Sequence, residues 1–198
     1  MDKNVQKLCE IHAEQFKDHV VTLTQDGSFA RLVWQNCDGS NICRIVYMWR
    51  GGLLLIYGDM GDAVFTWYGV NLNLSFLGSV NIDYMLSKCQ ASEVGRDFRQ
   101  WNSDAAEDWV KFFNEDREDY GLPPLTADQK EGIQHACQNQ HEWLEFIQST
   151  EGEKAFGEDI WESWDVGLIP HTRFVAMWLG LRLAARQLNA AAKKEAAA

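Results

Sequence analysis

The spacing of apolar runs in the first third of the chain most strongly limits its fold. Five short β-type runs alternate with turn pairs such as Asp26-Gly27, Asp38-Gly39 and Gly51-Gly52. Glycine and aspartate favour tight turns, and these connectors are too short for a parallel crossover, which needs about a dozen residues. The sequence therefore predicts an antiparallel meander of four to five strands. The expected strands are Val20–Thr24, Phe29–Gln35, Ile42–Trp49, Leu53–Tyr57 and Ala63–Tyr68.

Two of these runs, Leu53–Tyr57 and Ala63–Tyr68, are apolar on both faces. Strands with this pattern are covered on both sides in a folded sheet. We therefore expect them to be central strands, or strands with one face covered by helices and the other by a partner.

Helical periodicity flanks the β-type segment. Apolar residues recur at helical spacing from Asp2 to about His19, and the helical period returns after Tyr68. A capping box that begins at Thr126 opens a long helix, which is expected to end at about Gln148. The other expected helices are Asn81–Ser87, Ser103 to about Glu118, Asp159–Trp164 and a final helix from about Thr172.

These patterns predict an α+β fold: an antiparallel β-meander with an N-terminal helix and a C-terminal helical region. We expect residues 1–70 to form the first helix and the sheet, and residues 71–189 to form helices that pack on it within one compact unit. Residues 190–198 are rich in Ala and Lys and are expected to form a flexible tail.

The composition permits one well-packed core. The chain has 198 residues, of which 46% are hydrophobic, and it contains nine tryptophans. Tryptophan combines a large apolar ring with a single polar N–H, so it serves mainly in cores and as an interface anchor. We expect most of the nine to be core residues.

The charge of the chain is concentrated in its middle. The formal net charge is -11, and the segment from Asp83 to Asp165 holds 20 acidic side chains against 7 basic ones. Duplex DNA or RNA is not expected as a direct ligand, because binding phosphates requires Lys and Arg to displace counterions. Anionic membrane surfaces are disfavoured for the same reason. The negative electrostatic field of this segment is instead complementary to a cationic protein surface.

Several sequence features indicate a cytoplasmic protein. The N-terminal segment lacks the apolar run and cleavage site of a signal peptide, and no run approaches the roughly 18 apolar residues of a membrane span. The five cysteines are scattered and odd in number, which favours reduced thiols over a disulfide framework. No cofactor is expected, because no complete cofactor motif is present.

Two local patterns suggest chemistry. Cys137, His141 and Glu145 follow at i, i+4 and i+8, so on one helix they would share a face. They could contribute to an enzyme or metal site, but they do not make a complete set of metal ligands. The Gly58–Asp62 segment resembles a phosphate or calcium loop, but it lacks the remaining residues of either motif. A tight hairpin explains its glycines and aspartates. We therefore predict no enzyme activity.

The run Gly51–Trp67, GGLLLIYGDMGDAVFTW, resembles a group of uncharacterised bacteriophage and prophage proteins. The resemblance covers about a tenth of the chain and brings no established active site. Small acidic phage proteins of this kind include inhibitors of host defence, among them anti-CRISPR proteins that occupy nucleic-acid-binding surfaces. The resemblance thus implies a phage protein in the cytoplasm of a host cell.

The leading hypothesis is a stoichiometric inhibitor that mimics nucleic acid and binds a cationic host defence protein through an acidic surface. Carboxylates on an outer helix face raise the encounter rate, while aromatic anchors supply affinity. The first alternative is an enzyme or metal-binding protein that uses Cys137, His141 and Glu145. The second is an oligomeric structural or regulatory protein, such as a homodimer formed through the final helix. The expected partner-binding residues are Asp104, Glu107, Asp108, Glu115, Asp116, Glu118, Asp119, Trp101, Trp161 and Trp164.

Overall fold

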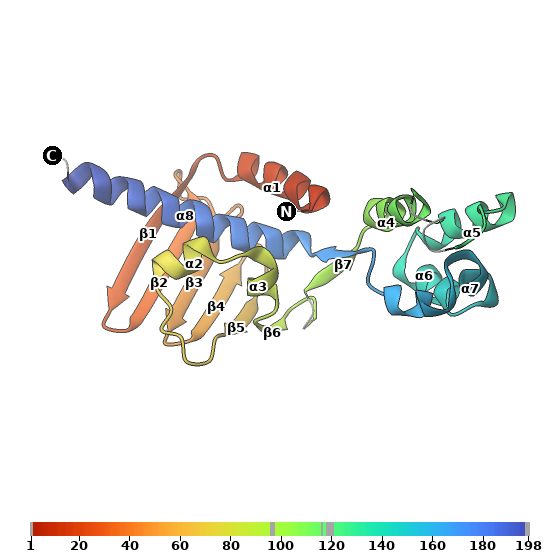
Figure 1. Ribbon diagram of the computed structural model, residues 1–198. Helices are drawn as coiled ribbons and strands as arrows, with labels where there is room; N and C mark the ends of the chain where they lie inside the picture. The colour runs from red at the N-terminus through yellow and green to blue at the C-terminus, as the bar shows by residue number, and fades with distance from the viewer. Residues whose placement is uncertain (1, 96–97, 116, 118–120, 197–198) are drawn as a thin grey trace. The chain divides into compact units, whose positions relative to one another are not determined.

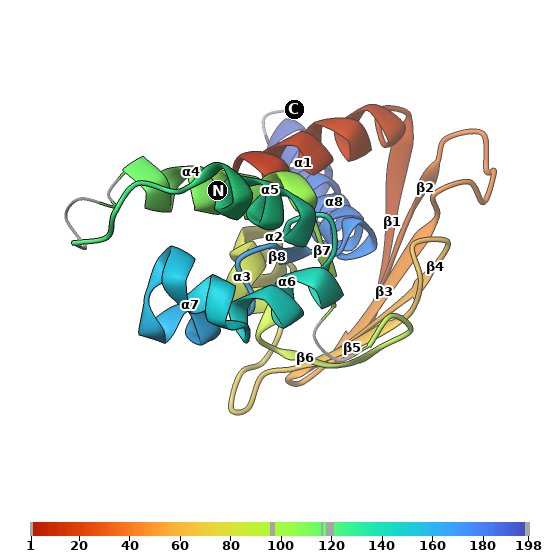
Figure 2. The same ribbon diagram turned by 90° about the vertical axis from the view of Figure 1, so that its right-hand side faces the viewer.

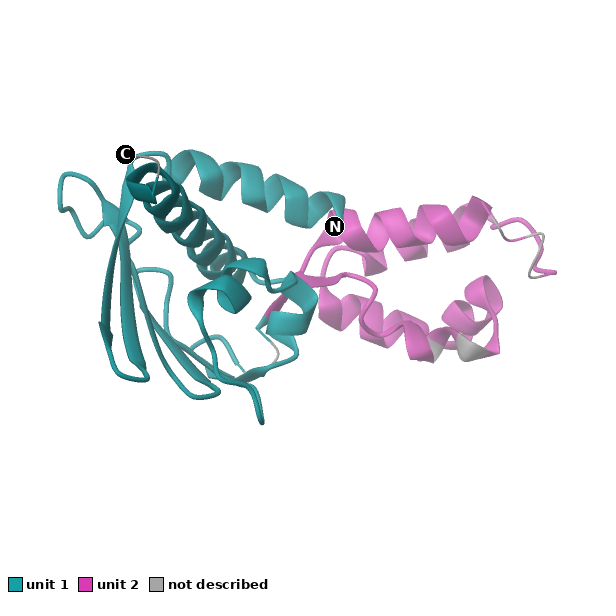
Figure 3. Ribbon diagram, turned by 60° about the vertical axis from the view of Figure 1, so that its left-hand side comes forward, with its two compact units in different colours: residues 1–98, 170–198 teal, residues 99–169 magenta. Residues whose placement is uncertain are grey.

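The computed structural model describes residues 2–95, 98–115, 117 and 121–196. The chain divides into two compact units (Figure 3). Unit 1 contains residues 1–98 and 170–198, and unit 2 contains residues 99–169. The boundary expected near residue 70 does not coincide with this division, because both ends of the chain contribute to unit 1.

Unit 1 is built on a six-stranded antiparallel sheet with strand order β1-β2-β3-β4-β5-β6. The predicted α+β class and the antiparallel meander are therefore confirmed, with one strand more than expected. The expected central runs lie inside the sheet, with β4 between β3 and β5 and β5 between β4 and β6. The strands are β1 (His19–Asp26), β2 (Phe29–Asn36), β3 (Ile45–Arg50), β4 (Leu53–Gly58), β5 (Ala63–Thr66) and β6 (Cys89–Ser92).

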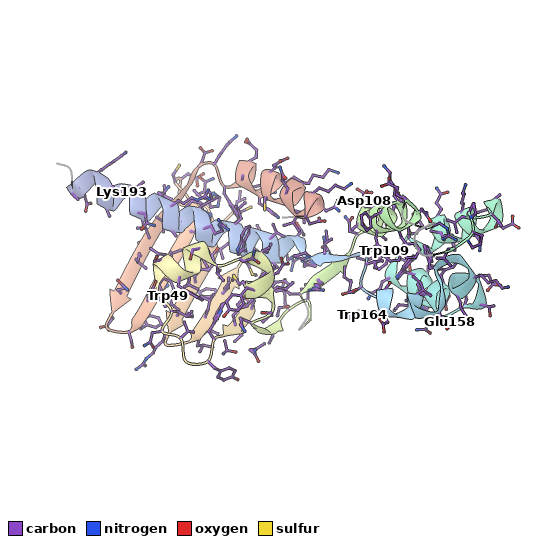
Figure 4. All side chains as sticks on the ribbon, viewed as in Figure 1. Trp49, Asp108, Trp109, Glu158, Trp164 and Lys193 are labelled. Carbon is purple, nitrogen blue, oxygen red and sulfur yellow. The ribbon has the colours of Figure 1, made fainter. Side chains whose placement is uncertain are left out.

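Four helices of unit 1 lie on one side of this sheet, as Figures 1 and 2 show. Asp2 caps the first of them, accepting hydrogen bonds from two backbone N–H groups, and Asn81 caps the third in the same way. Trp49, labelled in Figure 4, belongs to the buried core that the sheet shares with these helices. The helices are α1 (Lys3–Gln15), α2 (Leu74–Ser79), α3 (Ile82–Leu86) and α8 (Thr172–Ala196).

The final helix, α8, packs over the middle of the sheet. The buried hydroxyl of Tyr47 donates a hydrogen bond to the carbonyl of Met177 at 2.7 Å. Gly180 permits this close approach, because a Cβ at that position would lie 2.7 Å from the Tyr47 hydroxyl. The apolar stripe of α8 that includes Phe174, Trp178 and Leu181 is therefore part of the core of unit 1.

A flexible tail was expected for residues 190–198, of which the structure describes residues 190–196. Helix α8 continues to Ala196, so residues 190–196 are helical and exposed. Alanine has the highest helix propensity, and Lys193 and Lys194 in the last turn complement the helix dipole. These two effects explain the extension.

Unit 2 is mainly helical and has its own hydrophobic core, centred on the fully buried Trp143 and on Phe156. The long helix expected from Thr126 to Gln148 is in fact two helices. The Asn139 side chain accepts a hydrogen bond from the backbone N–H of Glu142 at 3.0 Å and so begins a new helix. The elements are β7 (Arg99–Trp101), α4 (Ser103–Glu115), α5 (Ala127–Ala136), α6 (Gln140–Ile147), α7 (Thr150–Phe156), the 3-10 helix η1 (Glu158–Ser163) and β8 (Leu168–Pro170).

The chain leaves and re-enters unit 1 at neighbouring points. The backbone N–H of His171 donates a hydrogen bond to the carbonyl of Phe98 at 3.0 Å. The buried Phe98 ring also packs against Phe174, with 5.4 Å between the ring centroids. Unit 2 is therefore an insertion whose two ends meet, an arrangement in which domain insertions are tolerated.

We predict that unit 1 folds without the insertion. Replacing residues 99–169 by a short Gly/Ser linker should preserve a cooperative thermal transition and a mixed α/β circular-dichroism spectrum, because the core of unit 1 contains no residue from the deleted segment. The same deletion carrying Trp178→Glu should abolish the transition, since Trp178 is buried and its indole N–H donates to the carbonyl of Val80. A shortened chain without any cooperative transition would contradict this prediction.

The Gly58–Asp62 turn gives a second stability prediction. Gly61 has a φ of +96°, so Gly61→Val should lower the free energy of unfolding by about 1–3 kcal/mol. Chemical denaturation of the variant measures this loss. Gly132→Ala is the control, because Gly132 lies within α5 and a Cβ there would be 3.7 Å from its nearest neighbour, the Phe146 ring. Equal effects of the two substitutions would show that the Gly61 backbone is not constrained.

Candidate functional site

The negative charge of the protein belongs to unit 2. Its 71 residues include 17 acidic and 5 basic side chains, a formal charge of -12. Unit 1 has 12 acidic and 13 basic side chains and a formal charge of +1. The two values add to the total of -11 for the whole chain. An acidic insertion thus interrupts a nearly neutral unit.

Helix α4 presents part of this charge to solvent. Asn102 precedes the helix and accepts a hydrogen bond from the backbone N–H of Ala105 at 2.7 Å. Ala106 and Val110 are buried in the core of unit 2, whereas Asp104, Glu107 and Glu115 are exposed. Asp108 is half-buried; Figure 4 labels it beside Trp109. Among the other acidic residues proposed for the site, Asp116, Glu118 and Asp119 lie outside the described residues.

The three tryptophans proposed as exposed anchors have different positions. Trp101 is half-buried: its indole N–H donates to the carbonyl of Cys137 at 3.0 Å, and its ring packs near Trp143. Trp164, labelled in Figure 4, is 49% exposed. The side chain of Trp161 lies outside the described part of the structure. Trp101 therefore supports the fold of unit 2, and Trp164 remains an available anchor.

Arg117 is a buried cation within this acidic unit. Its guanidinium donates hydrogen bonds to the carbonyls of Pro123 and Ala155. Burial lowers the pKa of Arg117. These bonds connect the segment after α4 to the C-terminal end of α7, so we assign Arg117 a structural role.

The residues of the metal hypothesis do not share one helix. Cys137 is a buried residue at the end of α5, whereas His141 and Glu145 lie on the exposed face of α6. His141 and Glu145 pair with each other at 3.3 Å. Among the described residues, no group of three or more His, Cys, Asp or Glu side chains could hold a metal ion. The premise of a shared helix face was wrong, because Asn139 starts a new helix.

A first cavity, of about 430 Å³, lies between α4 and α5. Val110, Leu125 and Ile133 form its apolar part, and Lys111 and Lys130 are among its polar residues. Cys137 also lines it. Burial, with a smaller contribution from the Glu107 carboxylate, raises the pKa of the Cys137 thiol to about 12. This thiol is therefore neutral at physiological pH and is a poor nucleophile or metal ligand.

A second cavity, of about 300 Å³, has aromatic walls. Trp109, Phe113 and Phe156 line it, and their ring centroids are 5.2–5.5 Å apart. Ile160 and the exposed Glu158 complete one side. The sequence did not reveal this cavity, because no local pattern connects Trp109 and Phe113 to Phe156 and Glu158.

Comparison of the chain with protein-family models, curated proteins and solved structures found no match. Within the described part of the chain, no helix has the length and apolar character that crossing a membrane requires.

The raised pKa of Cys137 predicts a pH-dependent stability. Below the ordinary thiol pKa of 9.0, the folded and unfolded states both keep the proton, so the stabilisation is fully present. As the pH rises from about 9 towards 12, the unfolded chain loses this proton first and stability falls. Relative to Cys137→Ala, the wild type should lose up to about 1.4 kcal/mol per pH unit in this window. Urea unfolding at pH 8, 9 and 10 measures the difference, and parallel stability curves for the two proteins would contradict it.

Proposed function

We propose that the protein acts by binding, and that unit 2 covers the cationic, nucleic-acid-binding surface of a partner protein. The segregation of charge carries this proposal: unit 2 has a formal charge of -12, and unit 1 has +1. Concentrated negative charge destabilises a compact unit through self-repulsion. Its restriction to one inserted unit is consistent with a role at the surface of that unit.

The resemblance of Gly51–Trp67 to phage proteins makes a host defence protein, such as a CRISPR effector, the partner class to test first. In this proposal the protein is a stoichiometric inhibitor without chemistry of its own. Exposed carboxylates of α4 raise the encounter rate with Arg and Lys side chains that normally contact phosphates. Glu107 and Glu115 are the exposed acids through which we test the surface.

The oligomer hypothesis receives less support. Phe174, Trp178 and Leu181 are buried against the sheet. Leu179 and Leu183, half-buried on α8, pack against the same core. The apolar surface of α8 that suggested a dimer is thus largely buried within unit 1.

A matched pair of variants tests the proposed acidic surface. Glu107→Lys with Glu115→Lys should reduce capture of partner proteins from a nuclease-treated bacterial lysate by about tenfold or more, because charge reversal repels a cationic surface. The control, Glu10→Lys with Glu195→Lys, makes the same change in net charge at exposed residues of unit 1 and should preserve capture.

Mass spectrometry of the captured proteins provides the measurement. We expect the proteins lost from the unit 2 variant to be nucleic-acid-binding proteins. Both variants should keep the wild-type melting temperature within a few degrees, since exposed charges contribute little to stability. Equal capture by the two variants would remove α4 from the interface.

A further inference from the structure

We propose that the aromatic cavity of unit 2 is an anchor site for an arginine side chain of the partner protein. The cavity is lined by Trp109, Phe113, Phe156, Ile160 and Glu158, among other residues. This inference rests on the proposed function and identifies the part of unit 2 that supplies affinity, because exposed rim charges contribute little binding energy.

The walls of the cavity suit a planar cation. Trp109 and Phe113 are stacked at 5.3 Å, and Phe156 packs against both rings. Trp109 and Phe113 are only half-buried, so part of their surface is available to a ligand. Aromatic faces attract cations through their quadrupole, and guanidinium groups also stack on such rings.

The charge of the lining residues has the required sign. Glu158 is exposed at the start of η1, and none of the described lining residues is basic. Figure 4 labels Trp109 and Glu158 in unit 2. A carboxylate beside aromatic rings can accept the paired N–H donors of a guanidinium while the rings contact its plane.

The first cavity lacks this combination. Lys111 and Lys130 line it together with Glu107 and Glu115, and its apolar residues are aliphatic. A cationic side chain would meet two lysines beside the two carboxylates there, and no aromatic ring on which it could stack. The aromatic cavity is therefore the better site for a cation, although it is the smaller of the two.

The size of the aromatic cavity indicates a side chain as the ligand. Its volume of about 300 Å³ is at the lower limit of small-molecule pockets.

The test compares nona-arginine with nona-lysine, two peptides of equal formal charge, by fluorescence anisotropy at 150 mM salt on the full-length protein. We expect the wild type to bind nona-arginine about fivefold more tightly than nona-lysine. In Glu158→Gln this preference should fall to nearly one. Glu131→Gln removes one charge from an exposed residue of unit 2 that lines neither cavity, and it should retain the preference.

Trp109→Leu provides a second variant, which keeps an apolar side chain and removes the ring. It should also abolish the preference for arginine, and circular dichroism determines whether the variant is folded. Glu158 is exposed, so Glu158→Gln tests the proposal even where Trp109→Leu does not fold.

The results separate this inference from the proposed function. Equal binding of the two peptides by the wild type, or equal effects of Glu158→Gln and Glu131→Gln, would overturn the arginine site while leaving the acidic surface intact. A wild type that binds neither peptide would argue against both. A preference for nona-lysine would also overturn the assignment, because an ammonium lacks the planar fork of arginine.

Discussion

The contact between α8 and the middle of the sheet organises unit 1. The side-chain hydroxyl of Tyr47 donates a hydrogen bond to the carbonyl of Met177, and Gly180 lets the helix approach closely enough for that bond. Glycine within a helix lowers its stability by about 1 kcal/mol relative to alanine, so its presence in α8 reflects the packing requirement. The face of strands β2 and β3 that packs against α8 is therefore covered only after this C-terminal helix has formed.

This arrangement allows unit 2 to carry a high net charge while the core of unit 1 is unaffected. Because α8 and the sheet complete unit 1 without residues 99–169, the insertion can vary in surface character while the core of unit 1 is preserved. Unit 2 in turn depends on a dense aromatic core, where Trp109, Trp143 and Phe156 contact one another. Burial of large rings offsets the repulsion among its carboxylates. Trp109 and Phe156 therefore both stabilise the unit and line its second cavity.

Local sequence signals predicted most elements of this fold. The capping residues Asn81 and Thr126 correctly marked helix starts, and the turn glycines correctly separated the strands. Asn139 was missed because apolar residues continue at helical spacing across it, although its side chain begins a new helix. Strand β6 was missed because Cys89–Ser92 is short and lacks a run of β-branched residues.

The division into units and the aromatic cavity depend on contacts between distant parts of the chain. No local pattern reveals that His171 returns to Phe98, or that Phe156 meets Trp109. The acidic character of the site was visible in composition. Its aromatic part was not, because the sequence alone does not distinguish a ring that fills a core from one that also borders a cavity.

The position of unit 2 between Phe98 and His171 also determines the order in which the parts of the fold are synthesised. Unit 2 is contiguous and precedes α8 in the chain, so all its residues are synthesised before those of α8. The sheet of unit 1 and the helices α1, α2 and α3 are made earlier, but α8 comes last. The part of the apolar face that α8 covers therefore stays open throughout translation of the insertion. Domains generally fold as units while the chain emerges. The inserted acidic unit is therefore synthesised between the sheet and its last covering helix. A high net charge favours solubility, so the charge of unit 2 suits a chain in which part of an apolar face is still open.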